Sequence, residues 1–143
     1  PTEATMKKTK LFLDYAATHP DAVLTYKASD MVLALHSDAS YLSEPEARSR
    51  AGGHFFMSED VADPTNNGAV LNTAQIIKAV MSSAAEAELG AMFIYAREAV
   101  PARITLEELG HKQPKTPMQI DSSTAVGEWS TSTSNQDGQR QWT

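Results

Sequence analysis

Met81-Ser82-Ser83-Ala84-Ala85-Glu86-Ala87-Glu88-Leu89-Gly90-Ala91-Met92-Phe93 is the stretch that decides how this chain folds. It has the pattern of a helix start, because Ser83 and Glu86 stand at the three-residue spacing of a capping box. In that box the serine oxygen accepts a backbone N–H and the glutamate reaches back to the cap. Glu86 also lies in the first turn, near the positive end of the helix dipole. Capping therefore accounts for Glu86 in structural terms.

Glu88 needs a different explanation. On a helix its same-face neighbours are Ala91, Met92 and Tyr95, so its carboxylate borders the apolar side. A carboxylate in that position either turns to solvent or is held for a purpose. We therefore treat Glu88 as a candidate site residue and search for other carboxylates that could meet it.

The composition indicates one folded domain that does not bind a membrane. The chain has 143 residues, is 41% hydrophobic and contains no cysteine, which excludes disulfides and thiolate metal sites. Its longest apolar run, Met31 to Leu35, is too short to span a bilayer. No signal-peptide pattern follows the first lysines, so we expect an intracellular protein. The first methionine is Met6, which suggests a fragment of a longer protein.

The formal net charge of −6 argues against passive wrapping of nucleic acid. It leaves open an enzyme that reaches a phosphate backbone through bound cations. The four histidines are scattered, with no pair at helical spacing for zinc, and no glycine-rich phosphate loop follows a strand.

The hydrophobic pattern predicts an α/β fold in which three antiparallel strands precede a crossover helix and a further parallel strand. Proline and glycine positions set the expected boundaries, with a break or kink of the long helix at Pro101 and a C-terminal cap at Gly110. The expected elements are a helix at Met6–Ala17, strands at Ala22–Tyr26, Met31–Asp38, Gly53–Ser58, Ala69–Asn72 with Ile76–Met81, and Met118–Asp121, a loop or hairpin turn at Ser43–Gly53, and helices from Ala84 and at Ala102–Leu109.

Three carboxylates recur at the expected edges of this fold. Asp38 ends a central strand, Glu88 lies in the helix, and Asp121 ends the later strand. Magnesium and manganese need clustered oxygen ligands, and two such ions can clamp the attacking water and the leaving oxygen of a phosphodiester. The pattern alone leaves two explanations open, because aspartates that end strands often serve only to form turns.

The segments Asp38-Ala39-Ser40-Tyr41, Ser83 to Glu88, and Asp121-Ser122-Ser123-Thr124-Ala125 resemble three ordered blocks of a known family. That family is the ribonuclease H domain of copia-type LTR retrotransposon polyproteins, and the resemblance covers roughly Lys8 to Val126. In the family's second block, the second glutamate is the residue that aligns with the catalytic acid of ribonucleases H. In this chain that position is Glu88, in agreement with the assignment of Glu86 to the helix cap. Ser122 departs mildly from the asparagine that the family often has.

The resemblance implies a ribonuclease H-like mixed sheet that hydrolyses the RNA strand of an RNA–DNA hybrid with Mg²⁺ or Mn²⁺. Asp38, Glu88 and Asp121 would be the catalytic and metal-binding acids. Arg48, Arg50 and Lys78 could touch phosphates, although solvated surface charge also explains them. The partners implied are the hybrid and the reverse transcriptase region of the same polyprotein, in a cytoplasmic virus-like particle or in the nucleus.

The resemblance also implies a domain division and a truncation. Residues 1–27 would be the junction after the reverse transcriptase region, and residues 28–126 a ribonuclease H-like domain that lacks the final helix, the final strand and the fourth acid. Residues 127–143 read as a disordered or out-of-frame tail. One back-translation of residues 135–143, shifted by one base, encodes Lys-Ala-Met-Asp, which resembles the family's continuation.

Three interpretations therefore remain open from the sequence. The first is a ribonuclease H-type nuclease whose second metal would be poorly held. The second is a non-catalytic remnant of that domain. The third is an α/β interaction module in which the acids are ordinary turn residues.

Overall fold

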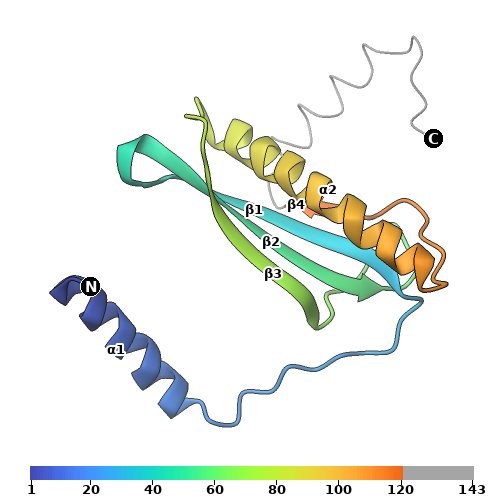
Figure 1. Ribbon diagram of the computed structural model, residues 1–143, viewed down its shortest axis with the longest axis horizontal. Helices are drawn as coiled ribbons and strands as arrows, with labels where there is room; N and C mark the ends of the chain where they lie inside the picture. Colours follow the sequence, from blue (N-terminus) through green and yellow to red (C-terminus); the bar gives the residue numbers. More distant parts are fainter. Residues whose placement is uncertain (121–143) are drawn as a thin grey trace.

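The computed structural model describes residues 1–120 of the chain (Figure 1). It has an α/β architecture with one mixed sheet of four strands in the order β3-β2-β1-β4. Only the β1–β4 pair is parallel. The elements are α1 (Glu3–Thr18), β1 (Val32–Glu44), the short 3₁₀ turn η1 (Pro45–Ala47), β2 (Arg48–Ser58), β3 (Ala69–Ile77), α2 (Ala84–Glu108) and β4 (Met118–Ile120).

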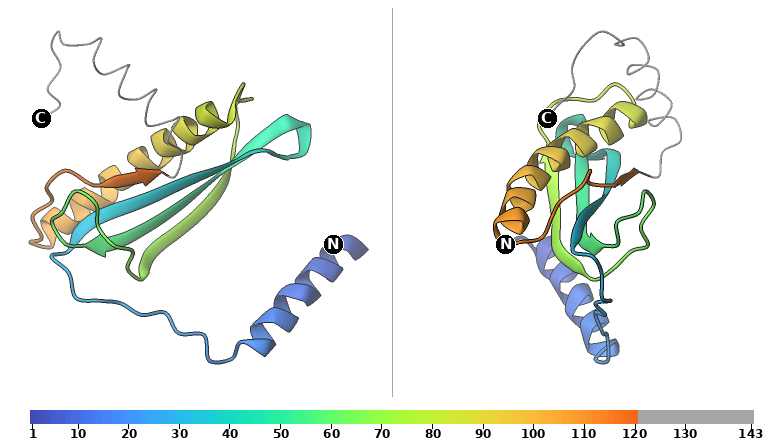
Figure 2. Two further views of the ribbon diagram at one scale, coloured as in Figure 1. Left: turned by 180° about the vertical axis from the view of Figure 1, so that it is seen from behind. Right: turned by 90° about the vertical axis from the view of Figure 1, so that its right-hand side faces the viewer.

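The first three strands form the predicted antiparallel meander. β1 and β2 make a long hairpin, with Leu35 opposite Phe55 and Ser40 opposite Arg50. β2 then pairs with β3, with Gly53 opposite Thr73. α2 crosses back over the sheet, and β4 comes to lie beside β1 (Figures 1 and 2). The predicted order of three strands, a helix and a parallel strand is thus confirmed.

The core lies between α2 and one face of the sheet. Alternate strand residues point to the same face, and Leu33, Leu35 and Phe55 form one buried cluster with Ala91 and Tyr95 of α2. Small residues let the helix approach closely, since a Cβ at Gly53 would stand 2.8 Å from the Tyr95 ring. Burial of this face is what holds α2 against the meander.

The opposite face of the sheet is covered at one end by the β2–β3 connection. Ala34 and Phe56 belong to this face and are fully buried, and Pro64 in the connection is buried as well. The Gln119 side chain, also on this face, donates to Asp63 and to the carbonyl of Pro64. The other end of this face is open and carries the hollow described below.

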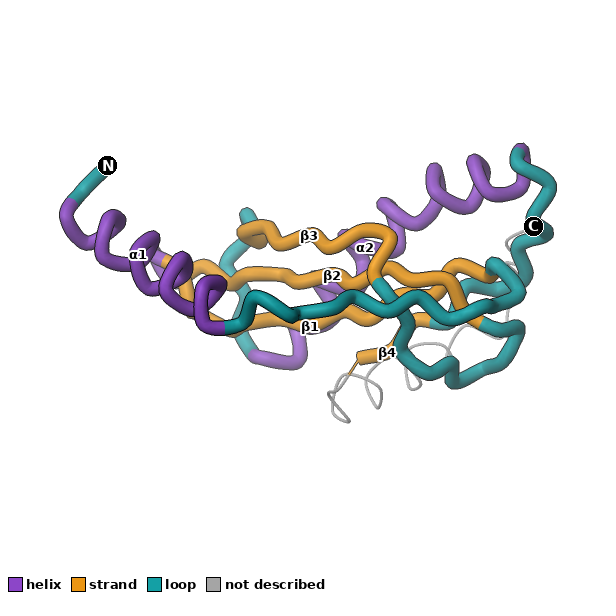
Figure 3. Tube along the Cα trace, turned by 90° about the horizontal axis from the view of Figure 1, so that it is seen from below, coloured by secondary structure: helices purple, strands orange, loops and turns teal. Residues whose placement is uncertain are grey.

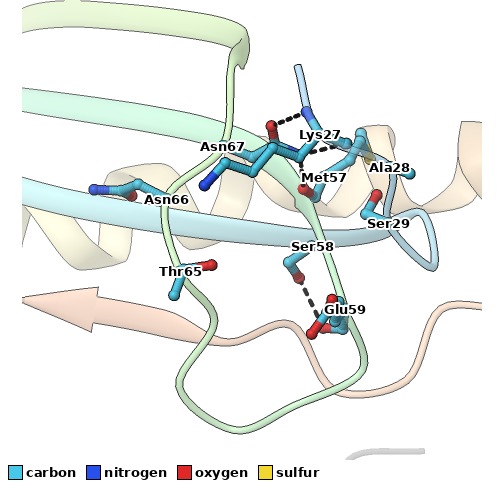
Figure 4. A pocket seen from close by; sticks show the side chains of 9 residues that line it. All are labelled: Lys27, Ala28, Ser29, Met57, Ser58, Glu59, Thr65, Asn66 and Asn67. Atoms are coloured by element: carbon cyan, nitrogen blue, oxygen red, sulfur yellow. Dashed lines mark hydrogen bonds between the residues drawn. The ribbon is translucent and has the colours of Figure 1, made fainter. Parts of the chain in front are cut away.

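Asn67 fastens the chain that leads into the sheet. Its side-chain Oδ1 accepts from the N–H of Lys27 at 2.7 Å, and its Nδ2 donates to the carbonyls of Lys27 and Met57 at 3.0 and 2.9 Å (Figure 4). The Tyr26 hydroxyl donates to the carbonyl of Ala69 at 3.0 Å. The residues just before β1 are therefore tied to the β2–β3 connection.

α1 confirms the helix predicted at Met6–Ala17, and Thr2 caps it. None of its residues is buried. In Figure 1 α1 lies apart from the sheet, and in Figure 3, seen from below, it passes in front of one end of the strands. No helix in the described part of the chain has both the length and the apolarity needed to cross a membrane.

Four predicted details were wrong. Ala22–Tyr26 does not form a strand; the chain there is attached through the Tyr26 hydroxyl and, at the next residue, through the bonds of Asn67 to the Lys27 backbone. Ser43–Gly53 is mostly strand, since β1 and β2 continue to the turn at η1 and Arg50 pairs with Glu44 across it. The third predicted strand is not interrupted: β3 is continuous and ends at Ile77. Of the break or kink expected at Pro101, the break is absent, because α2 continues through Pro101 to Glu108.

The predicted cap of the long helix is confirmed. Gly110 follows the last residues of α2 with a φ of +93°, a left-handed conformation that glycine adopts without strain. His111 then donates its N–H to the carbonyl of Leu106 at 2.9 Å. This turn directs the chain back toward β4.

Candidate functional site

The start of α2 is capped by Ser83, as predicted. The Ser83 hydroxyl accepts the Glu86 N–H at 3.0 Å. The Glu86 carboxylate, however, accepts from the N–H and the hydroxyl of Ser82, at 2.6 and 2.5 Å, one residue earlier than a standard capping box would place it. Both hydrogen bonds lower the pKa of Glu86, and the bond from the Ser82 hydroxyl has the larger effect. Glu86 is thus fully engaged in the cap.

Glu88 lies on the inner side of the same helix and is only 7% exposed. Its Oε1 accepts the backbone N–H of Ala39 at 3.1 Å. Ala39 directly follows Asp38 in β1. The structure therefore brings the helix glutamate against the strand residue next to the first predicted aspartate.

The geometry of β1 explains why a side chain reaches this N–H. Leu35 donates to the carbonyl of Pro117 at 3.0 Å, so its N–H faces the β4 side. N–H groups two residues apart on a strand point to the same side, so those of Leu33 and Ala39 face this side too. Leu33 donates to the Gln113 side chain at 3.0 Å, and Ala39 donates to Glu88. Two side chains thus act as acceptors before and after the short β4 ladder.

Asp38 is exposed and marks the point where β1 emerges from the core, because the preceding strand residues are mostly buried. By alternation its side chain lies on the face away from α2. There it lines a shallow hollow of about 410 Å³. The floor beside Asp38 is flat, because Gly52 is its cross-strand partner and has no side chain.

A polar row crosses all four strands next to Asp38. Gln119, His36, His54 and Asn72 occupy matching register positions on β4, β1, β2 and β3. His36 and Gln119 are hydrogen-bonded, and His54 Nδ1 lies 2.8 Å from Asn72 Oδ1. The side of the hollow that faces away from Asp38 is therefore lined by side chains that form hydrogen bonds.

Asp121 lies outside the described residues, so its place relative to Asp38 and Glu88 is untested. The pair that immediately precedes both aspartates is described: Ser37 pairs with Ile120. The approach to β4 is held by Arg103, whose guanidinium donates to the carbonyls of Gln113 and Pro114 and to the Thr116 hydroxyl. These contacts fix the register of the strand that leads to Asp121.

The predicted phosphate contacts occupy two places. Arg48 forms an ion pair with Glu46 at 2.9 Å, and Arg50 with Glu44 at 2.5 Å, both in the β1–β2 hairpin. The hydrogen bond and charge of Glu44 raise the pKa of Arg50, and those of Arg50 lower the pKa of Glu44. Lys78 is exposed just past the end of β3. To bind phosphate, Arg48 and Arg50 would have to release Glu46 and Glu44.

Within residues 1–120, no group of three or more histidine, aspartate or glutamate side chains is arranged to hold a metal ion. The donors present at this edge are carboxylate oxygens, which suit a hard cation such as Mg²⁺ or Mn²⁺ better than zinc. The chemistry of Asp38 and Glu88 suits such an ion, but the two carboxylates approach it from different sides: by alternation the Asp38 side chain lies on the face away from α2, and Glu88 comes from α2. The third predicted ligand lies outside the described residues.

Sequence reasoning did not identify the polar row or the two residues that support β4. His36 and His54 are scattered in the sequence, since they lie eighteen residues apart and only the strand register makes them neighbours. Gln113 and Arg103 carried no signal, because a loop glutamine and a helix arginine are ordinary surface residues by pattern. Knowledge of the register would have been needed to find all four.

Comparison with known proteins found no matching family model, no matching curated protein and no matching solved structure.

Proposed function

We propose that this chain is a ribonuclease H-like nuclease domain of a copia-type retroelement polyprotein. Its reaction would be the hydrolysis of the RNA strand of an RNA–DNA hybrid, dependent on Mg²⁺ or Mn²⁺. The observation that carries the proposal is the hydrogen bond from Ala39 to Glu88, because it joins the helix carboxylate to the strand position beside Asp38.

The topology supports the proposal at the level of the fold. An antiparallel meander, a crossover helix and a strand parallel to β1 are the arrangement that the resemblance implies. In this arrangement β4 ends at Ile120 beside the middle of β1, and ligands of α/β sheets commonly bind beyond the carboxyl ends of parallel strands. Ser37 and Ile120 pair at the end of β4, directly before Asp38 and Asp121.

The burial of Glu88 supports a specific role for it. A carboxylate that is only 7% exposed is costly to bury. Held by Ala39, its side chain is oriented toward the strand edge before any ligand arrives. Preorganisation of this kind is what a metal-binding carboxylate needs.

Asp38 and Glu88, together with Asp121, would hold the cation, and the cation would supply Lewis acidity and an activated water at the phosphodiester. The exposed Asp38 can reach a ligand from solvent, whereas Glu88 is positioned by the fold. The hollow beside Asp38 offers a flat floor and the polar row for the sugar–phosphate chain. A ribonuclease H-type enzyme would recognise the 2′-hydroxyl and the hybrid shape rather than the base sequence.

A hybrid-cleavage assay tests the proposal. The full chain is incubated with a labelled RNA–DNA hybrid and Mn²⁺, beside Asp38→Asn, Glu88→Gln and Glu86→Gln. Glu86→Gln is the matched control, because Glu86 belongs to the same helix turn but serves the cap. We expect the first two variants to lose about 100-fold or more in rate, since they remove metal ligands, and the control to keep its rate.

Equal traces of cleavage in all four proteins would indicate a contaminating nuclease and would contradict the proposal. Absence of cleavage by the folded wild-type chain would favour the second candidate, a non-catalytic form of the same domain. The ion pairs of Arg48 and Arg50 favour that candidate, because they engage two of the three cations expected to touch phosphate.

A further inference from the structure

β3 is an edge strand of the sheet that residues 1–120 form. Its inner side pairs with β2. No strand in residues 1–120 pairs with the outer side. The Tyr26 hydroxyl engages the carbonyl of Ala69, at the first residue of the strand. An edge of this kind presents alternate backbone N–H and C=O groups that can pair with another strand.

The edge lacks the features that usually prevent such pairing. Proteins protect edge strands with charged residues, proline, bulges or short length. β3 is nine residues long, and its sequence Ala-Val-Leu-Asn-Thr-Ala-Gln-Ile-Ile contains no charge and no proline. The only irregularity of its register lies near its start, opposite Phe55 and Phe56. Val70 and Leu71 are 50% and 46% exposed, and Ile76 is 39% exposed.

We propose that β3 pairs antiparallel with β3 of a second copy of this chain, about a twofold axis at Thr73. Thr73 is the midpoint of Ala69–Ile77, so this register alone pairs the whole strand. It sets Thr73 opposite itself and Val70 opposite Ile76, both of which are favourable cross-strand pairs. Because the strand has no charge, the self-pairing opposes no like charges.

The pairing would join the two sheets into one continuous sheet. Cross-strand partners share a face, so both α2 helices would lie on the same side of it. In Figure 1, α2 lies over β1 and β2 rather than along the outer edge of β3, so α2 would not obstruct a partner strand at that edge. The interface is the same patch on both copies, as a closed twofold dimer requires.

The inference is tested by measuring the oligomeric state of the full chain and of two variants that place opposite charges at Ala74. Ala74 is exposed on β3, and in the proposed register it lies opposite Asn72, one position from the axis. In a homodimer of Ala74→Lys, or of Ala74→Glu, the two like charges would be diagonal neighbours. We expect either variant to raise the dimer dissociation constant about threefold, and an equimolar mixture of the two to restore dimerisation.

Val100→Lys is the control, because Val100 is similarly exposed but lies on the outer side of α2. Sedimentation analysis across concentrations, with circular dichroism to check folding, gives the readout. A wild-type dimer that the control preserves, each charge weakens and the mixture restores would support the inference. A wild-type chain that is monomeric at all concentrations, or a dimer indifferent to Ala74, would overturn it.

Discussion

The carboxylate of Glu88 accepts the backbone N–H of Ala39 at 3.1 Å, across the gap between α2 and β1. This contact is the structural centre of the candidate site, because it fixes the buried glutamate beside the strand position that carries Asp38. It also satisfies a backbone N–H on the β4-facing side of β1, as the Gln113 side chain does for the N–H of Leu33. We therefore expect Glu88 both to stabilise the packing of α2 against β1 and to take part in the proposed metal binding.

The first prediction concerns this hydrogen bond. Glu88→Ala removes the acceptor of a partly buried N–H and should lower the free energy of unfolding by about 1–3 kcal/mol. Glu88→Gln keeps an acceptor oxygen and avoids burying a charge, so it should stay within about 1 kcal/mol of wild type. Urea unfolding of the three proteins measures both values. An alanine variant as stable as wild type would show that Ala39 does not depend on Glu88.

The second prediction compares two adjacent glycines of β2. Gly53→Ala should destabilise the protein by about 1–3 kcal/mol through overpacking, because its Cβ would stand 2.8 Å from the Tyr95 ring. Gly52→Ala should change stability little, since the nearest atom, the Asp38 carbonyl oxygen, is 3.9 Å away. Thermal unfolding of both variants checks the difference. Equal effects would mean that α2 is not seated on Gly53.

The third prediction concerns acid stability. The Ser82 contacts hold the pKa of Glu86 below its usual value of 4.5. A depressed folded-state pKa contributes stability that is present above the unfolded value and is lost as the pH falls through the folded value. Wild type should therefore lose stability below about pH 4.5 more steeply than Glu86→Gln does. Urea unfolding at pH 3 to 7 measures the slopes, and parallel slopes would contradict the prediction.

The fourth prediction concerns the attachment of the segment before β1. Asn67→Ala removes acceptors and donors for the backbone of Lys27 and for the carbonyl of Met57, and should lower stability by about 1–3 kcal/mol. It should also speed proteolysis at residues 19–28. Asn66→Ala is the control, because the neighbouring side chain makes no hydrogen bond with the described residues (Figure 4). Cleavage rates that do not distinguish the two variants would refute the attachment.

The parts of the fold that could be predicted from sequence are those set by local chemistry. Helix capping identified the start of α2 at Ser83, and the apolar run from Met31 indicated the buried part of β1. The same capping argument separated Glu86, which faces the cap, from Glu88, which is buried.

The failures were of another kind, because they depended on partners distant in sequence. Arg50 looked like a loop residue, but it lies in β2, between Ser40 of β1 and Ile76 of β3. The row of His36 and His54 exists only through the β1–β2 register. Ala22–Tyr26 looked like a strand by composition, but the backbone beside it is engaged by Asn67 instead. Such contacts could not be read from local periodicity.

The central claim is that Asp38, Glu88 and Asp121 hold one divalent cation. Titration of the full chain with Mn²⁺, followed by the enhancement of water proton relaxation, tests it most directly. The account predicts saturable Mn²⁺ binding that Asp38→Asn, Glu88→Gln and Asp121→Asn each weaken by about tenfold or more, while Glu86→Gln leaves it unchanged. Saturable binding that none of the three variants weakens, or no binding by the folded chain, would contradict the account.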